Sequence, residues 1–168
     1  MKLSELNGLA PARFIAMLRG VFEHSPWIAA AACDRRPFSS IDALHAAMVE
    51  IIESAPADAQ LALLRAHPEL ASKAAIRGEL SNESNREQAD AGLTHCSPAE
   101  FSRLHALNRA YDAKFGFPFI IAVKGLERSQ IIARCAERLE RDRASEFATA
   151  LGEVARIARY RLEALLEE

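Results

Sequence analysis

The sequence FGFPFIIAV, residues 115–123, interrupts a chain that otherwise shows helical periodicity along most of its length. Gly116 and Pro118 rule out an undisturbed helix, whereas the residues around them are too apolar for an exposed loop. The pattern therefore predicts a buried extended segment. Its backbone amides cannot all find helical partners, so they must bond to neighbouring backbone, to water or to a ligand.

On both sides of this segment, apolar residues recur at helical spacing and helix start signals precede them. Ser39, three residues before Asp42, is expected to begin a helix that runs to about Glu53. Ser97 and Glu100 predict a capping box at the start of another helix. Helices are predicted over residues 10–22, 27–33, 40–53, 58–66, 84–92, 98–115, 129–141 and 145–166, with a further helical piece opening at Pro68 and a loop over residues 73–81. The predicted fold is all-α, a compact bundle of about eight helices with a short buried extended segment near 115–123.

Composition indicates one domain without a polyanionic or lipid partner. With 168 residues, half of them hydrophobic, the chain is long enough for one core and too short for two ordinary domains. A single domain over residues 1–168 is expected. The formal net charge of -2 gives no general attraction for nucleic acid or anionic lipid, and no apolar run is long enough to span a membrane. Neither a signal peptide nor a peroxisomal address is recognisable, so a cytoplasmic protein is expected.

The cysteines and histidines do not predict a metal site. Cys33, Cys96 and Cys135 are widely spaced and form no CxxC pair, so neither a disulfide framework nor a thiolate zinc site is indicated. The five histidines form no HExxH or comparable pair. We therefore expect no bound metal.

The segment AHPEL, residues 66–70, contains the first candidate for proton chemistry. A histidine side chain titrates near neutral pH, so His67 could act as a general acid or base. The alternative is a structural histidine that caps a helix opening at Pro68 or lies half exposed. The residue before a proline is biased away from helical backbone, so His67 is expected to separate two helical pieces.

The segment ESNREQADAGL, residues 83–93, allows two interpretations. Ser84 followed three residues later by Glu87 has the spacing of a capping box, which would explain both residues without a substrate. The same helix start would also offer amides and the positive end of a dipole to a polar ligand. The spacing does not decide between the two.

Arg161 is a charged residue of the last predicted helix that lies in line with its apolar residues. Val154, Ala158, Arg161 and Leu165 recur at intervals of four, three and four, so the guanidinium lies on or beside the apolar stripe. An arginine at such a position either extends its guanidinium to the surface or pairs it with an anion, and the first outcome is the more common.

Taken together, AHPELA, ESNREQADAGL and LNRAYDAKFGFPFIIAVKG resemble, in order and spacing, the 2-oxo-4-hydroxy-4-carboxy-5-ureidoimidazoline (OHCU) decarboxylases of urate breakdown. The resemblance covers essentially the whole chain. It implies an all-helical homodimer that decarboxylates a small anionic ureidoimidazoline without metal or organic cofactor, giving (S)-allantoin and carbon dioxide. It also implies a stand-alone enzyme without the fused hydroxyisourate hydrolase domain of some relatives.

The resemblance assigns site residues position by position. The catalytic residues of the family correspond to His67 and Glu87. The arginine of the last helix corresponds to Arg161, although Arg159 lies close by. The remaining substrate-binding positions correspond to Pro68, Ser84, Asn85, Arg86, Gln88, Phe119, Ile120, Ile121, Ala122 and Val123, with Glu87 among them as well.

Two alternatives from other classes remain open at this stage. One is a noncatalytic helical module that binds a partner through the HPEL and FGFPF surfaces, which requires an exposed apolar patch. The other is a hydrolase that acts on a related ureide with the same histidine and carboxylate.

Overall fold

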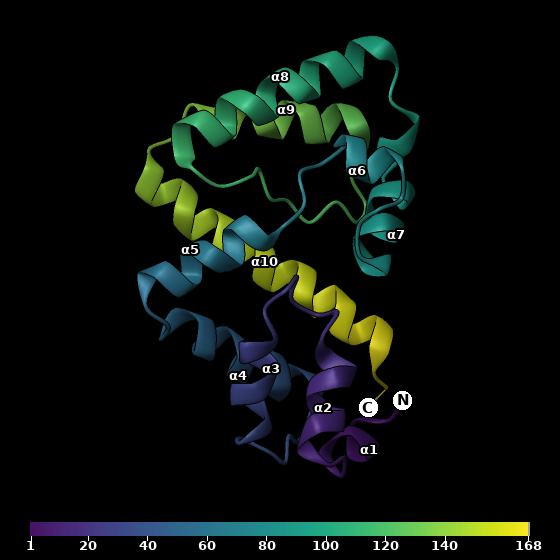
Figure 1. Ribbon diagram of the computed structural model, residues 1–168, viewed down its shortest axis with the longest axis vertical. Coiled ribbons are helices and arrows are strands. Elements are labelled where there is room, and N and C mark those ends of the chain that lie inside the picture. Colours follow the sequence, from purple (N-terminus) through teal and green to yellow (C-terminus); the bar gives the residue numbers. More distant parts are fainter. Residues whose placement is uncertain (168) are drawn as a thin grey trace. The chain divides into compact units, whose positions relative to one another are not determined.

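A computed structural model describes residues 1–167, apart from the side chains of residues 73 and 74, and Figure 1 shows its helical architecture. Within the described residues the only β-type pairing is an isolated bridge between Lys2 and Glu167. The predicted all-α class is confirmed. None of the helices described is both long and apolar enough to cross a bilayer. The backbone contacts group the chain into two compact units, Met1–Ala66 with Ala155–Glu168, and His67–Val154.

The first unit is built from short amphipathic helices. Its helix α2 ends at Leu18, earlier than the predicted residue 22, where Gly20 weakens the helix. Val21 and Phe22 are nevertheless buried. Figure 1 shows α3 beside α2 and α4, which it contacts. The helices of this unit are α1 (Leu3–Asn7), α2 (Pro11–Leu18), α3 (Pro26–Cys33), α4 (Ile41–Glu53), α5 (Ala57–Ala66) and the last part of α10 (Arg143–Leu165).

The second unit contains the interrupted segment and the helices around it. The long helices α8 and α9 lie side by side, as Figure 1 shows in green. Tyr111, Phe115 and Phe117 are fully buried and form its aromatic core. The elements of this unit are α6 (Lys73–Ile76), α7 (Asn82–Asp90), the 3-10 helix η1 (Leu93–His95), α8 (Pro98–Phe115), α9 (Arg128–Leu139) and the first part of α10.

Two predicted helix starts and one predicted loop are corrected by the structure. Ser40, rather than Ser39, caps α4 by accepting a hydrogen bond from the Ala43 amide. Pro68 does not open a helix, because the chain forms an irregular turn there. Residues 73–81, predicted to be a loop, contain the short helix α6 at their start.

The predicted capping box at Ser97 is confirmed. The Ser97 hydroxyl accepts from the amide of Glu100, and the Glu100 carboxylate accepts from the amide of Ser97 at 2.8 Å. These hydrogen bonds hold the pKa of the Glu100 carboxyl below its usual range. Gly116 ends this helix in the left-handed region with φ 77°, a conformation that glycine adopts without strain.

The segment after Gly116 is non-helical and buried, as its sequence predicts. Phe117 and Phe119 are almost completely inaccessible, and the following residues to Val123 are also buried. The chain turns at residues 124–125 before α9 begins. This buried irregular run is the feature around which the candidate site is built.

Candidate active site

The HPEL turn begins at His67, which is only 8% exposed. The turn is fastened from two sides. The carbonyl of Leu70 accepts a hydrogen bond from Asn108 Nδ2 at 2.9 Å, and the amide of Ala71 donates to Gln88 Oε1 at 2.9 Å. Ala71 has φ 51°, a strained value for a residue with a Cβ. The two hydrogen bonds offset the energetic cost of this backbone conformation.

Helix α7 presents two polar residues to the interior of the protein. Ser84 and Gln88 lie one turn apart on the same face, and each is 3% exposed. Ser81 caps this helix, since its hydroxyl accepts from the amide of Ser84 at 3.2 Å. The capping-box interpretation of Ser84 and Glu87 is therefore wrong, and the cap does not explain why a serine is buried at position 84.

The amide group of Gln88 has a defined orientation. Oε1 accepts from the Ala71 amide, so the other end of the amide group is Nε2, which carries the two N–H donors of the side chain. A buried NH2 group suits a carbonyl or carboxylate oxygen of a ligand.

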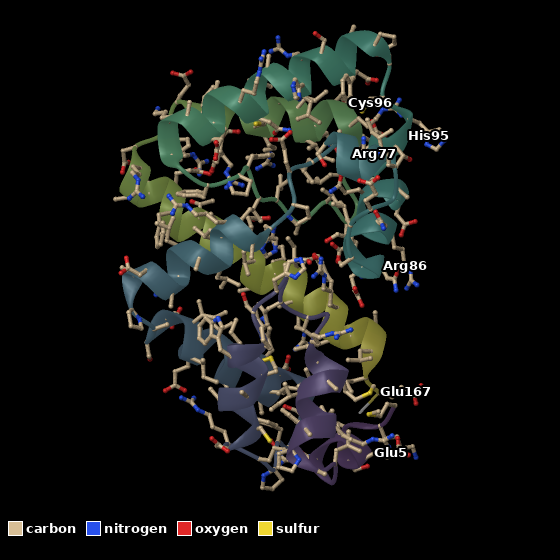
Figure 2. All side chains as sticks on the ribbon, in the orientation of Figure 1. Glu5, Arg77, Arg86, His95, Cys96 and Glu167 are labelled. Carbon is tan, nitrogen blue, oxygen red and sulfur yellow. The ribbon has the colours of Figure 1, made fainter. Side chains whose placement is uncertain are left out.

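The remaining predicted residues of α7 are less buried. Glu87 is partly exposed, and Arg86 is exposed, with its side chain extending outward from the helix in Figure 2. Asn85 donates from Nδ2 to the carbonyls of Gly78 and Leu80, which fastens the loop before the helix. Of this stretch, Ser84, Glu87 and Gln88 are the residues with side chains suited to a site.

The buried run over residues 119–123 is held by side chains of α9 and α10. Arg138 Nη1 donates to the carbonyl of Ile120 at 2.7 Å. The amide of Ala122 donates to Glu153 Oε2 at 2.6 Å. The sequence suggested that amides of this run bind the substrate, but the Ala122 amide already has a partner within the protein.

A buried charged network packs against this run and was not predicted from the sequence. Arg138 Nε donates to Glu146 Oε1 at 2.5 Å, and the Tyr111 hydroxyl donates to the same oxygen. Burial, followed by the hydrogen bond to Glu146, raises the pKa of Tyr111, which keeps its hydroxyl protonated as a donor. Burial raises the pKa of the neighbouring Cys135 to about 12, so its thiol stays neutral.

A usable signal for Arg138 was present in the sequence. Ile131, Cys135 and Arg138 recur at intervals of four and three, and all three are buried on one face of α9. Arg161 lies at the same spacing relative to Val154 and Ala158 on the last helix.

Arg161 belongs to the first unit, where it is 7% exposed. Its Nη1 donates to the carbonyl of Gly20 at 3.0 Å and lies 3.2 Å from Glu23 Oε1, which is equally buried. The more common outcome, an arginine extending to the surface, is therefore wrong here, because the guanidinium meets an anion. Arg159 instead pairs with Asp42 and Glu163 in a more exposed position.

A hollow of about 420 Å³ elsewhere in the second unit is lined by none of the predicted site residues. Its one arginine, Arg128, donates to the carbonyls of Gly92 and His95 and lies 3.5 Å from Glu100. These contacts give Arg128 a structural role. Among the described residues, no group of three or more histidine, cysteine or acidic side chains is arranged to hold a metal.

Comparison with known proteins identifies the class. The chain matches the OHCU decarboxylase family over residues 7–163. It is 42% identical over 165 residues to the 2-oxo-4-hydroxy-4-carboxy-5-ureidoimidazoline decarboxylase of Halalkalicoccus jeotgali, covering 98% of this chain and 92% of that protein. It is 40% identical to the uric acid degradation bifunctional protein of Bacillus sp. (strain TB-90), covering all of this chain and 33% of the relative. The crystal structure of (S)-allantoin synthase superimposes with a TM-score of 0.80 at 29% identity, covering 99% of this chain and 54% of that one.

The helical fold and these similarities place the chain among the carboxy-lyases, enzymes that release a carboxylate as carbon dioxide. More closely, the chain belongs to the OHCU decarboxylase family, as its three motifs predict. The relatives connect that family with the degradation of urate.

Proposed function

We propose that this protein converts OHCU into (S)-allantoin and carbon dioxide, the third step from urate to allantoin, with His67 and Glu87 as catalytic residues. The observation that carries the proposal is the burial of His67 at the start of a turn that Gln88 and Asn108 fasten. His67, helix α7 and the run over residues 119–123 all belong to the same compact unit.

The substrate contains its own electron sink. The carboxylate leaves a carbon that bears a hydroxyl and is bonded to the carbon of an imine. When the bond to the carboxylate breaks, its electron pair forms a carbon–carbon double bond, and the imine electrons move to nitrogen, which takes a proton. The hydroxyl then loses a proton while the ureido-bearing carbon gains one. Bound pyridoxal or thiamine is not needed to accept the electrons.

The protein must therefore orient the substrate and move protons. In the proposal, His67 carries out the main proton transfer and Glu87 orients either His67 or the substrate. Delivery of the last proton to one face of the ring carbon makes a single enantiomer. A water-excluding environment, to which buried Phe119 contributes, keeps solvent from delivering that proton to either face.

The polar edges of the substrate are assigned to further residues. Gln88 offers its NH2 group, with Ser84 buried one turn before it. Pro68, Asn85, Arg86 and residues 119–123 complete the set by resemblance. Arg161, also by resemblance, is proposed to offset the charge of the substrate carboxylate.

The decisive test is an assay with freshly generated OHCU. We expect stoichiometric release of carbon dioxide and an excess of (S)-allantoin over the other enantiomer, measured by circular dichroism of the product. The uncatalysed reaction serves as control, because protonation by solvent shows no preference for one face. Carbon dioxide release at the uncatalysed rate, with a racemic product, would contradict the proposal.

The same assay separates the alternatives. A hydrolase on a related ureide would leave the carboxylate in place, so carbon dioxide would form no faster than in the uncatalysed reaction. A noncatalytic module would need its FGFPF surface exposed, but Phe117 and Phe119 are buried. The described burial therefore favours an enzyme.

We further propose a cytoplasmic homodimer in which each chain is one domain. Size-exclusion chromatography with light scattering should give twice the chain mass of 18.5 kDa, and a mass equal to one chain would reject the dimer. Thermal unfolding should follow one cooperative transition by all optical probes.

A further inference from the structure

We infer that Arg138, held by Glu146 and Tyr111, is a positioning residue that sets the direction of a substrate-binding amide in the run over residues 119–123. The inference rests on the proposed function, because it assumes that this run contacts the substrate. Neither the sequence motifs nor the resemblance assigns a role to these three residues.

The carbonyl group of Ile120 is held by Arg138. Arg138 Nη1 donates to Ile120 O at 2.7 Å, and its guanidinium lies 4.8 Å from the centre of the Phe119 ring. The carbonyl of Ile120 and the amide of Ile121 belong to one planar trans peptide unit, so their C=O and N–H bonds point in opposite directions. Arg138 therefore determines the side toward which the Ile121 amide points.

The next peptide unit is held in a similar way. The amide of Ala122 donates to Glu153 Oε2, which fixes the plane shared with the carbonyl of Ile121. Because the run has no helical or strand ladder, these side-chain hydrogen bonds replace the regular backbone pattern. Two successive peptide planes are thus set by side chains of α9 and α10.

Glu146 and Tyr111 in turn fix the guanidinium. Glu146 is completely buried and Arg138 is 4% exposed, so their ion pair is shielded from solvent. The Tyr111 hydroxyl donates to the same carboxylate oxygen, and its ring packs edge-on against Phe119 at 5.4 Å. A planar guanidinium can contact a carboxylate, a carbonyl and a ring face together, whereas the ammonium of lysine cannot.

A buried ion pair is not by itself a sign of a stable fold, because apolar residues of the same volume often do as well or better. Its value in this position is geometric. The pair supplies a donor of fixed direction to a carbonyl that lies in a buried irregular segment.

The test compares wild-type enzyme with Arg138→Lys and the control Arg134→Lys, using freshly generated OHCU and thermal unfolding. Arg134 is an exposed residue of the same helix, α9. For Arg138→Lys we expect KM to rise about tenfold, the value of one hydrogen bond, with kcat changed by less than about threefold. For Arg134→Lys we expect KM, kcat and Tm to stay unchanged.

Tyr111→Phe is a second variant for the case in which Arg138→Lys does not fold. It keeps the aromatic ring and removes only one hydroxyl, so we expect it to fold. It should raise KM about threefold at unchanged kcat, because the carboxylate holds the guanidinium less firmly. A lowered Tm with wild-type KM and kcat in the folded variants would overturn this inference and leave the proposed function intact. A wild-type enzyme without turnover would overturn the proposed function and this inference with it.

Discussion

Replacing His67 with asparagine is expected to lower the rate of (S)-allantoin formation by about 10²–10⁴-fold, the usual contribution of a general acid or base. His67 is buried, and the turn that follows it is held by hydrogen bonds from Asn108 to the Leu70 carbonyl and from the Ala71 amide to Gln88. Asparagine is smaller but polar, so the turn should persist while proton transfer is lost. The measurement is the initial rate of optically active product from freshly generated OHCU.

The handedness of the product distinguishes chemistry from folding. Carbon dioxide would still form slowly from the substrate in the variant, but the allantoin should approach a racemic mixture. His95→Asn is the matched control, because His95 is exposed on η1, as Figure 2 shows, and its Nδ1 lies 2.9 Å from the neighbouring Thr94 hydroxyl. His95→Asn should retain the wild-type rate. A folded His67→Asn enzyme with near-normal, (S)-selective activity would refute the catalytic assignment.

Local rules predicted most of the helical architecture. Ser97 with Glu100 marked the start of α8 correctly, since a capping box depends on residues close in the chain. The same rule failed at α7. Ser81 and Ser84 are both possible N-cap residues, and only the structure shows that Ser81 caps the helix. Spacing cannot choose between two caps one turn apart, because both satisfy the same local geometry.

Motifs identified candidate site residues, but the long-range contacts of those residues could not be predicted from the sequence. Burial of His67 agrees with the expected role, although the sequence could not show that Gln88 and Asn108 fasten its turn. The partner of Arg161 could not be foreseen either, because Glu23 lies far away along the chain. Periodicity places a side chain inside the protein, but it does not say which distant charge it meets.

Replacing Glu146 with alanine is expected to lower the free energy of unfolding by about 3–5 kcal/mol, the typical cost of breaking a buried ion pair. Glu146 is fully buried and accepts from both Arg138 and Tyr111. Its removal leaves a guanidinium in the interior without its carboxylate and a buried tyrosine hydroxyl without its acceptor. Urea unfolding followed by circular dichroism measures the change. The control Glu137→Ala removes an exposed partner of Arg141 and should change stability by less than about 0.5 kcal/mol.

A double replacement separates stability from function. Combining Arg138→Met with Glu146→Leu removes both charges and fills the space with apolar atoms, so most of the lost stability should return. The carbonyl of Ile120 would still lack its donor, and the amide of Ile121 would lose its fixed direction. We therefore expect a stable double variant with a raised KM. A double variant that recovers both stability and wild-type KM would show that the buried pair serves folding alone, whereas recovery of stability without KM would show that the charge is retained to orient the backbone at the site.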